Sequence, residues 1–280
     1  MAIDKKLISK AYNKAASTYE EYAFLQKEVA SRLMERVDLM NVTPEQILDA
    51  GCGTGLATRM LAKKFGKSKI TGVDLSPGMV ERAKKNKGFF DKTQYQVADM
   101  QQLPFKDNQF DLVISNLALF WIKDLHKVFA EFNRVLKSGG LLIFSTLATD
   151  TLMELKQSWS RVDDDTHVNE FYDMHVIGDQ VYKAQFENTV MDRDIITLTY
   201  KTLLGLMRDI KLTGATNLNP NRAKGLLGKS KFEKLKQTYH EFSLPDGQLP
   251  ATCEIAYGHG WKKKEATKGD YHTYQVKMTE

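Results

Sequence analysis

Cysteine is scarce in this chain of 280 residues, since only Cys52 and Cys253 are present and they form no C-x-x-C pair. This spacing argues against a structural zinc site or a disulfide framework and favours a reducing compartment. Long apolar runs are also missing, because no stretch approaches the roughly 20 residues of a membrane-spanning helix. Residues 1–6 lack the apolar core of a secretion signal. We therefore expect a cytoplasmic protein without a metal, in which Cys52 fills space.

The net charge is only +5, but acidic and basic residues are unevenly distributed along the chain. One segment has few basic residues and another has few acidic ones. Residues 150–194 contain eleven acidic and four basic side chains, whereas residues 201–239 contain nine basic and two acidic ones. A basic segment of this kind can face nucleic acid, an acidic protein or only solvent. The charge pattern leaves these three alternatives open.

A glycine-rich loop is the most informative feature that is present. An apolar run leads to Asp49, and the glycines after it stand at alternate positions, Gly51, Gly53 and Gly55. Glycines allow positive φ and let a ligand approach the backbone. A dinucleotide fingerprint would need its third glycine at position 56, which is occupied by Leu56. A second apolar run ends in Asp74. Doubly wound nucleotide-binding folds place at this position the carboxylate that accepts ribose hydroxyls.

The following hundred residues extend this pattern. Residues 94–97 predict a third strand before Asp99 and Met100, residues 110–116 predict a fourth, and a Gly-Gly turn precedes a fifth at 141–145. In this order the motifs resemble the class I S-adenosylmethionine-dependent methyltransferases. The resemblance implies an α/β fold with a doubly wound, seven-stranded, Rossmann-like sheet. A carboxylate at Asp49 suits the cationic ammonium of such a cofactor.

The domain organisation follows from these landmarks. We expect an N-terminal helical cover over residues 1–44, with an amphipathic stretch from residue 3 to residue 37. The methyltransferase domain is expected at 45–262, with five strand–helix units at 45–147, a helix at 174–186 and final strands at 195–200 and 251–258. Fifty residues between those strands exceed a simple crossover, so a helical insertion is expected at about 201–248. A Lys-rich tail forms residues 263–280.

A narrower resemblance covers residues 3 to 261. It is carried by a Tyr-x-x-Ala-Ala-x-x-Tyr pattern and three longer segments: Tyr12 with Ala15, Ala16 and Tyr19, then residues 173–179, 207–217 and 249–261. These segments resemble the malonyl-acyl-carrier protein O-methyltransferases of biotin synthesis, the BioC family. Cys253 stands where an aromatic residue is expected. The resemblance implies methylation of the free carboxylate of a malonyl thioester, carried by acyl-carrier protein or by coenzyme A.

The resemblance also implies which residues surround the cofactor. Asp99 would bond the adenine amino group and Met100 would cover its ring, while Tyr19 and Trp121 would wall the site. The full predicted set is Tyr19, Gln26, Asp49, Gly51, Gly53, Gly55, Asp74, Leu75, Met79, Asp99, Met100, Asn116, Leu117 and Trp121.

The substrate carboxylate needs positioning groups rather than a base. A carboxyl group with a pKa of roughly 4 is already ionised near neutral pH, so no general base is expected. Arg208 is the first candidate anchor because a guanidinium matches two carboxylate oxygens and this one has apolar neighbours in sequence. Arg222, His175 and Tyr19 are further candidates. Arg208 paired with Asp209, and His175 as a helix cap, are the alternative interpretations.

Partners and rival functions complete the sequence prediction. Seven lysines are candidates for docking an acidic carrier protein: Lys5, Lys6, Lys10, Lys211, Lys224, Lys229 and Lys231. Residues 115–118 lack the Pro-Pro motif of nucleobase methyltransferases, so no nucleic acid is expected, and no membrane is expected. The alternatives are a methyltransferase for another small acid or a quinone precursor, a cofactor-binding assembly factor without methyl transfer, and an arginine hydroxylase on the same fold.

Overall fold

A seven-stranded sheet forms the centre of the computed structural model, which describes residues 4–220, 222, 225 and 228–264. Its strands, in the order β3-β2-β1-β4-β5-β7-β6, are β1 (Gln46–Ala50), β2 (Lys69–Asp74), β3 (Gln94–Val97), β4 (Phe110–Asn116), β5 (Leu136–Leu147), β6 (Phe186–Tyr200) and β7 (Leu249–Lys262). The pairs among β1 to β5 are parallel, and β7 runs antiparallel to both β5 and β6. The predicted doubly wound, seven-stranded α/β fold is confirmed.

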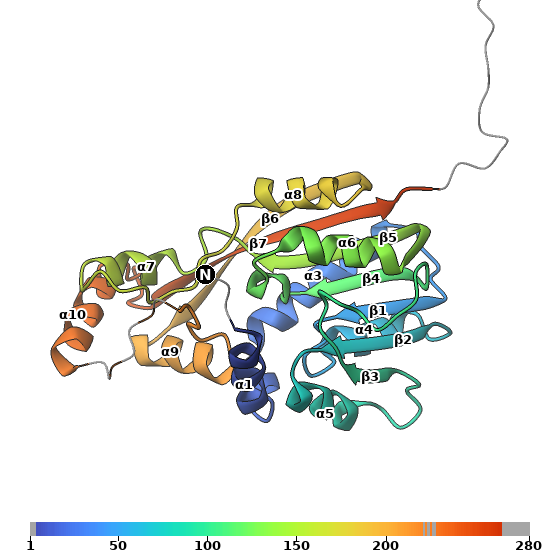
Figure 1. The fold of residues 1–280 in the computed structure, drawn as a ribbon. Helices are drawn as coiled ribbons and strands as arrows, with labels where there is room; N and C mark the ends of the chain where they lie inside the picture. Colours follow the sequence, from blue (N-terminus) through green and yellow to red (C-terminus); the bar gives the residue numbers. More distant parts are fainter. Residues whose placement is uncertain (1–3, 221, 223–224, 226–227, 265–280) are drawn as a thin grey trace, which may run out of the picture.

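Helices cover both faces of this sheet (Figure 1). They are α1 (Lys5–Ala15), α2 (Tyr19–Tyr22), α3 (Phe24–Leu39), α4 (Leu56–Lys64), α5 (Pro77–Asn86), the short 3-10 helix η1 (Leu119–Trp121), α6 (Leu125–Val135), α7 (Met153–Ser160), α8 (Met174–Lys183), α9 (Leu203–Leu212) and α10 (Lys229–His240). Within the described ranges, no helix has both the length and the apolar character needed to cross a membrane.

Alternation along the buried strands produces two separate cores. Leu48 and Val113 pack with helices α6 and α8, whereas their neighbours Ile47 and Leu112 pack with helices α3 and α4. Successive side chains of a strand point to opposite faces, so each strand contributes to both cores. Each fully buried aliphatic side chain contributes about 1.5–3 kcal/mol of transfer free energy. The site described below lies at the carboxyl ends of these strands, where β1 leads into the glycine loop.

The amphipathic stretch at the N-terminus consists of three helices, α1 to α3, with breaks at residues 16–18 and at Ala23. One local prediction was wrong. No helix follows β3, because residues 98–109 form turns and an isolated bridge between Asp99 and Gln102. Helix α1 packs beside α5 (Figure 1).

Strands β6 and β7 are longer than predicted and project beyond the rest of the sheet (Figure 1). Their far ends carry a third core in which α7, α9 and α10 contribute Leu155, Leu206 and Leu235. The helical insertion between the last two strands is confirmed and contains α9 and α10. Residues of α9 line a cavity that adjoins the space in front of the glycine loop.

Candidate active site

The glycine loop has left-handed backbone at all three predicted glycines, with φ of +82° at Gly51, +53° at Gly53 and +81° at Gly55. A Cβ at Gly51 would collide with Ala118, and one at Gly55 would collide with the Tyr95 hydroxyl. A Cβ at Gly53 would meet nothing within 4 Å. Two glycines therefore allow close packing, and Gly53 leaves an open face toward a ligand.

Asp74 ends β2 directly beside this loop. Its Oδ2 accepts a hydrogen bond from the Gly53 N–H at 2.9 Å, and its Oδ1 accepts one from the Ser76 N–H at 2.8 Å. Burial raises the pKa of Asp74, and these two backbone donors oppose the rise. Because an ionised carboxylate has about four acceptor positions, both oxygens retain capacity for a ligand's hydroxyls.

A cavity of about 190 Å³, which we call the glycine cavity, opens in front of Gly53 and Asp74. Ten residues of the predicted cofactor set line it: Tyr19, Gly51, Gly53, Asp74, Leu75, Asp99, Met100, Asn116, Leu117 and Trp121. Sequence reasoning did not assign Ile8 and Tyr12 of α1 to this wall. Their four-residue spacing on an amphipathic helix was the available signal.

The other four residues of that set lie elsewhere. Gly55 is the N-cap residue of α4, and Met79 is buried against Ala15 and Ala16. Gln26 lines a neighbouring cavity. Asp49 is fully buried below the loop.

Asp49 combines burial with an incomplete set of hydrogen bonds. Its Oδ2 accepts from the Thr58 hydroxyl at 2.5 Å, and its Oδ1 has no hydrogen-bond partner. Burial raises the pKa of Asp49 to about 7, which the Thr58 hydroxyl opposes. An unpaired buried carboxylate oxygen is costly, so the position fits a cationic group on a bound ligand.

Helix α1 closes one side of the glycine cavity. The Trp121 indole N–H donates to the Tyr12 hydroxyl at 2.8 Å, and Lys5 Nζ pairs with Asp99 Oδ2 at 2.5 Å. Asn13 Oδ1 accepts from the Gly78 N–H at 2.6 Å at the start of α5. Three side chains of α1 therefore attach this helix to three different parts of the fold.

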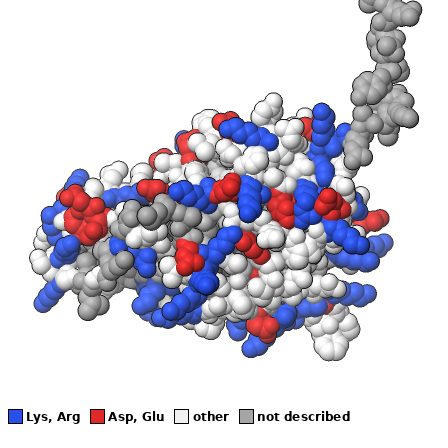
Figure 2. Space-filling model, in the orientation of Figure 1, with Lys and Arg blue, Asp and Glu red and all other residues white. Residues whose placement is uncertain are grey.

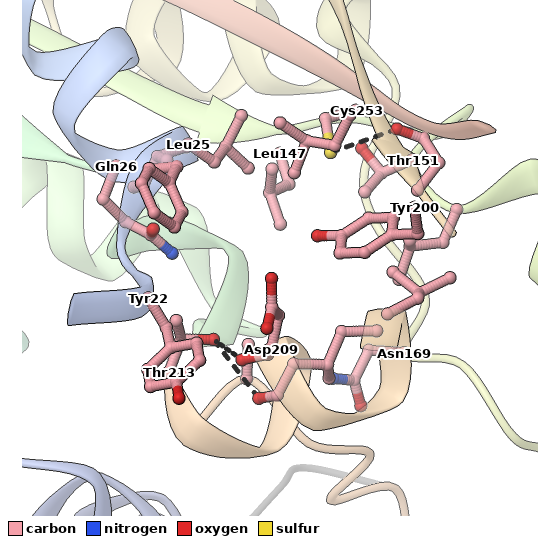
Figure 3. Close-up of a pocket in the computed structure, with 18 of the residues that line it drawn as sticks. Tyr22, Leu25, Gln26, Leu147, Thr151, Asn169, Tyr200, Asp209, Thr213 and Cys253 are labelled. Atoms are coloured by element: carbon pink, nitrogen blue, oxygen red, sulfur yellow. Dashed lines mark hydrogen bonds between the residues drawn. The ribbon is translucent and has the colours of Figure 1, made fainter. Parts of the chain in front are cut away.

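A second cavity of about 440 Å³, which we call the aromatic cavity, shares Tyr12, Tyr19 and Leu117 with the glycine cavity. Its wall is completed by α2, the start of α3, the ends of β6 and β7, and α9. Figure 3 shows the Asp209 carboxyl and the Tyr200 hydroxyl pointing into this space. Burial raises the pKa of Asp209, against smaller opposing effects from Tyr200 and Arg208. Burial likewise raises the pKa of the Cys253 thiol in this wall to about 12.

The predicted carboxylate anchors are not brought together. Arg208 is exposed rather than buried, and its Nη2 donates to the Tyr22 hydroxyl at 3.2 Å above the Tyr22 ring. His175 is 86% exposed at the start of α8, where it bonds Asp173, and it lines none of the three cavities described here. Arg222 lines a third cavity that is described below. Only Tyr19 lies where the glycine and aromatic cavities meet.

Comparison with known proteins places this fold and site in a class. Residues 48–144 match the family model described as a methyltransferase domain. The YcgJ protein of Bacillus subtilis has TM-score 0.59 and 17% identity, covering 84% of this chain and 98% of that one. A phosphoethanolamine N-methyltransferase of Haemonchus contortus, solved with S-adenosyl-L-methionine, has TM-score 0.52 and 19% identity, covering 84% and 53%. The fold and the glycine loop define a class I S-adenosylmethionine-dependent methyltransferase.

Full-length relatives identify the family. The malonyl-acyl-carrier protein O-methyltransferase of Gallionella capsiferriformans is 42% identical over 266 residues, which cover 93% of this chain and 91% of the relative. The protein of that name from Legionella pneumophila is 42% identical over 255 residues, covering 91% and 90%. The chain belongs to the malonyl-acyl-carrier protein O-methyltransferase family.

The residues of the glycine cavity fit S-adenosylmethionine. Gly53 offers an open backbone face, and Asp74 retains acceptor capacity for ribose hydroxyls. Asp49, which is buried below the loop and does not line the cavity, has one carboxylate oxygen without a partner. The individual cofactor contacts remain predictions.

Proposed function

We propose that this protein methylates the free carboxylate of a malonyl group carried by acyl-carrier protein, with S-adenosylmethionine as methyl donor. The observation that carries this proposal is the junction of the two cavities at Tyr12, Tyr19 and Leu117. A donor in the glycine cavity and an acceptor in the aromatic cavity would meet there. Relatives of about 40% identity that bear this activity in their names support the choice of acceptor.

The main requirement of the proposed methyl transfer is that the protein align the malonyl carboxylate with the methyl donor. Bound S-adenosylmethionine supplies a methyl group on a positively charged sulfonium. A malonyl carboxylate, with a pKa of roughly 4, can accept that methyl group without a general base. The role of the chain would be to hold the carboxylate in line at the junction and to exclude water, for which α1 and α9 supply parts of the cavity walls.

Tyr19 is the best-placed of the predicted positioning groups, because its side chain reaches both cavities. Arg208 stands at the rim through its contact with Tyr22, where it would meet an acceptor entering the aromatic cavity. Asp209 also lines the aromatic cavity, and burial raises the pKa of its carboxyl. Nothing in the position of His175 supports a role in the reaction.

The proposal extends to location and partners. We place the enzyme in the cytoplasm, in keeping with two buried free cysteines, Cys52 and Cys253. Malonyl-coenzyme A would serve as an alternative acceptor because it presents the same malonyl thioester. Neither a nucleic acid nor a membrane has a part in the proposed reaction.

Mass spectrometry of malonyl-acyl-carrier protein after incubation with enzyme and S-adenosylmethionine tests the function. We expect the mass gain of one methyl ester, and no gain on acetyl-acyl-carrier protein, which lacks the carboxylate. Asp74→Ala should weaken binding of S-adenosylhomocysteine by about 1.5–3 kcal/mol, the range for a hydrogen bond to a charged group. Glu35→Ala, which removes an exposed carboxylate on α3, is the matched control. An enzyme that binds S-adenosylhomocysteine yet leaves malonyl-acyl-carrier protein unchanged would contradict the proposal.

A further inference from the structure

A third cavity of about 400 Å³, which we call the mouth cavity, lies beyond the aromatic cavity. The two share five wall residues: Leu152, Asn169, Phe171, Ile210 and Ala215. The mouth cavity has no lining residue in common with the glycine cavity among the residues described. The three spaces are therefore arranged in series, with the glycine loop at one end and the mouth cavity at the other.

Two amide side chains hold the segments around the mouth cavity together: Asn169, which is buried and shared with the aromatic cavity, and Asn217, which is half-buried. Asn169 Nδ2 donates to the Thr216 carbonyl at 3.3 Å, and Asn169 Oδ1 accepts from the Leu218 N–H at 3.3 Å. Asn217 Nδ2 donates to the Thr166 carbonyl at 2.6 Å. These bonds join the segment after α9 to the segment before α8, so the passage is a defined feature of the fold.

The charge of the mouth cavity is of one sign. Lys211 and Arg222 line it, and no Asp or Glu does so among the described residues. Arg222 Nη1 donates to the Asn219 carbonyl at 3.0 Å, which leaves the remaining guanidinium donors available. Neither cation forms an ion pair with a carboxylate within the described part of the chain. By contrast, Lys231 nearby is paired with Asp163 at 2.7 Å.

We propose that the mouth cavity binds the phosphate of a phosphopantetheine arm, with Lys211 and Arg222 as its cationic partners. This inference rests on the proposed function, because a malonyl thioester reaches the enzyme on such an arm. The malonyl carboxylate must lie near Tyr19, at the far end of the series, so Arg222 cannot also be its anchor. The aromatic cavity between them accommodates the pantetheine chain. A guanidinium and an ammonium that line one cavity are suited to phosphate oxygens.

The phosphate is common to acyl-carrier protein and coenzyme A, so the test begins with the isolated arm. Rates are measured for malonyl-phosphopantetheine and for malonyl-pantetheine, which lacks the phosphate. The wild-type enzyme should prefer the phosphorylated substrate by about tenfold or more in kcat/KM, mainly through KM. The K211Q/R222Q double variant should lose this preference, read as the ratio of kcat/KM for the two substrates. The K63Q/K67Q variant, which removes two exposed charges near the end of α4, should behave as wild type.

Further outcomes separate this inference from the proposed function. Unchanged binding of S-adenosylhomocysteine shows that the double variant is folded. A double variant that keeps the full preference for phosphate, or a wild type without one, overturns the phosphate site and leaves the function intact. No methylation of any malonyl substrate by the wild-type enzyme would instead overturn the function. If the double variant turns over both malonyl-acyl-carrier protein and malonyl-coenzyme A more slowly than the wild type, the site binds the arm that the two substrates share. If only malonyl-coenzyme A is affected, the site binds the free coenzyme.

Discussion

Asp49 is the residue whose environment differs most from that of an ordinary carboxylate. It is fully buried and has one oxygen without a partner, and burial raises its pKa from 3.8 to about 7. The native state therefore binds a proton that the unfolded state releases above pH 4. Stability from this proton is present at low pH and is lost as the pH rises through about 7.

The Asp49→Asn variant tests this titration. Between about pH 4 and 7 the free energy of unfolding of the cofactor-free wild type should fall relative to that of the variant by up to about 1.4 kcal/mol per pH unit. Urea unfolding across that range measures both proteins. A constant offset between the two curves carries no information, because the Asn amide also lacks a full set of partners. Parallel pH profiles would show that Asp49 does not titrate in this range.

At the residue scale, sequence reasoning located the glycine loop, whereas of the predicted substrate-positioning groups only Tyr19 lies where the glycine and aromatic cavities meet. The loop and Asp74 are fixed by local chemistry, since positive φ and a strand end leave few alternatives. Arg208 and His175 were assigned from their neighbours in sequence. The direction of a helical side chain depends on how its helix docks, and both proved to be exposed. The burial of Asp49 beneath the loop was equally invisible without the fold.

Helix α1 illustrates how one element acts on the site as a unit. It contributes Ile8 and Tyr12 to the glycine cavity. In its last turn, Asn13 bonds it to the start of α5. Asn13 Oδ1 accepts both the Gly78 N–H and the Ser76 hydroxyl. Loss of this acceptor would loosen the cover where it meets α5, without removing any residue from the cavity wall.

Asn13→Ala should therefore weaken the binding of S-adenosylhomocysteine by about 1 kcal/mol, the net contribution of a typical hydrogen bond. Bound S-adenosylhomocysteine should slow proteolysis within α1 less in this variant than in the wild type. Titration calorimetry and limited proteolysis give the two readings. Lys14→Ala, which removes the next side chain of the same helix, also exposed, is the control and should leave both unchanged. Equal affinity in Asn13→Ala and wild type would mean that α1 does not hold the ligand.

Elements were predicted well where their pattern was strong. Residues 110–116, an apolar run with a buried strand's composition, were placed correctly as β4. The first part of β6 was missed because residues 187–194 contain several charged and amide side chains, which normally indicate a loop. That strand stays in the sheet through its register with β7, from Phe186 opposite Lys262 to Tyr200 opposite Leu249. Long-range pairing of this kind leaves no local signal.

On the scale of the whole molecule, the surface charge decides how a carrier protein would approach. Lys and Arg side chains lie over α1 and α9 on the face shown in Figure 2. Two of the candidate docking lysines are engaged, Lys5 with Asp99 and Lys231 with Asp163. Lys224 lies outside the described residues. The lysines that remain are Lys6, Lys10, Lys211 and Lys229, all exposed.

These exposed lysines would attract an acidic carrier protein across a wide surface, whereas malonyl-coenzyme A, in the proposed arrangement, would contact only the mouth and aromatic cavities. Raising the ionic strength should therefore increase the KM for malonyl-acyl-carrier protein far more than the KM for malonyl-coenzyme A, since exposed charges are screened over about 10 Å at 0.1 M salt. Initial rates over a salt series measure both constants. The Lys6→Glu/Lys10→Glu variant should raise the KM for the carrier protein alone, with Lys63→Glu/Lys67→Glu as the matched control. Equal salt dependence for the two substrates would remove the docking role of α1, because any phosphate contact is common to both.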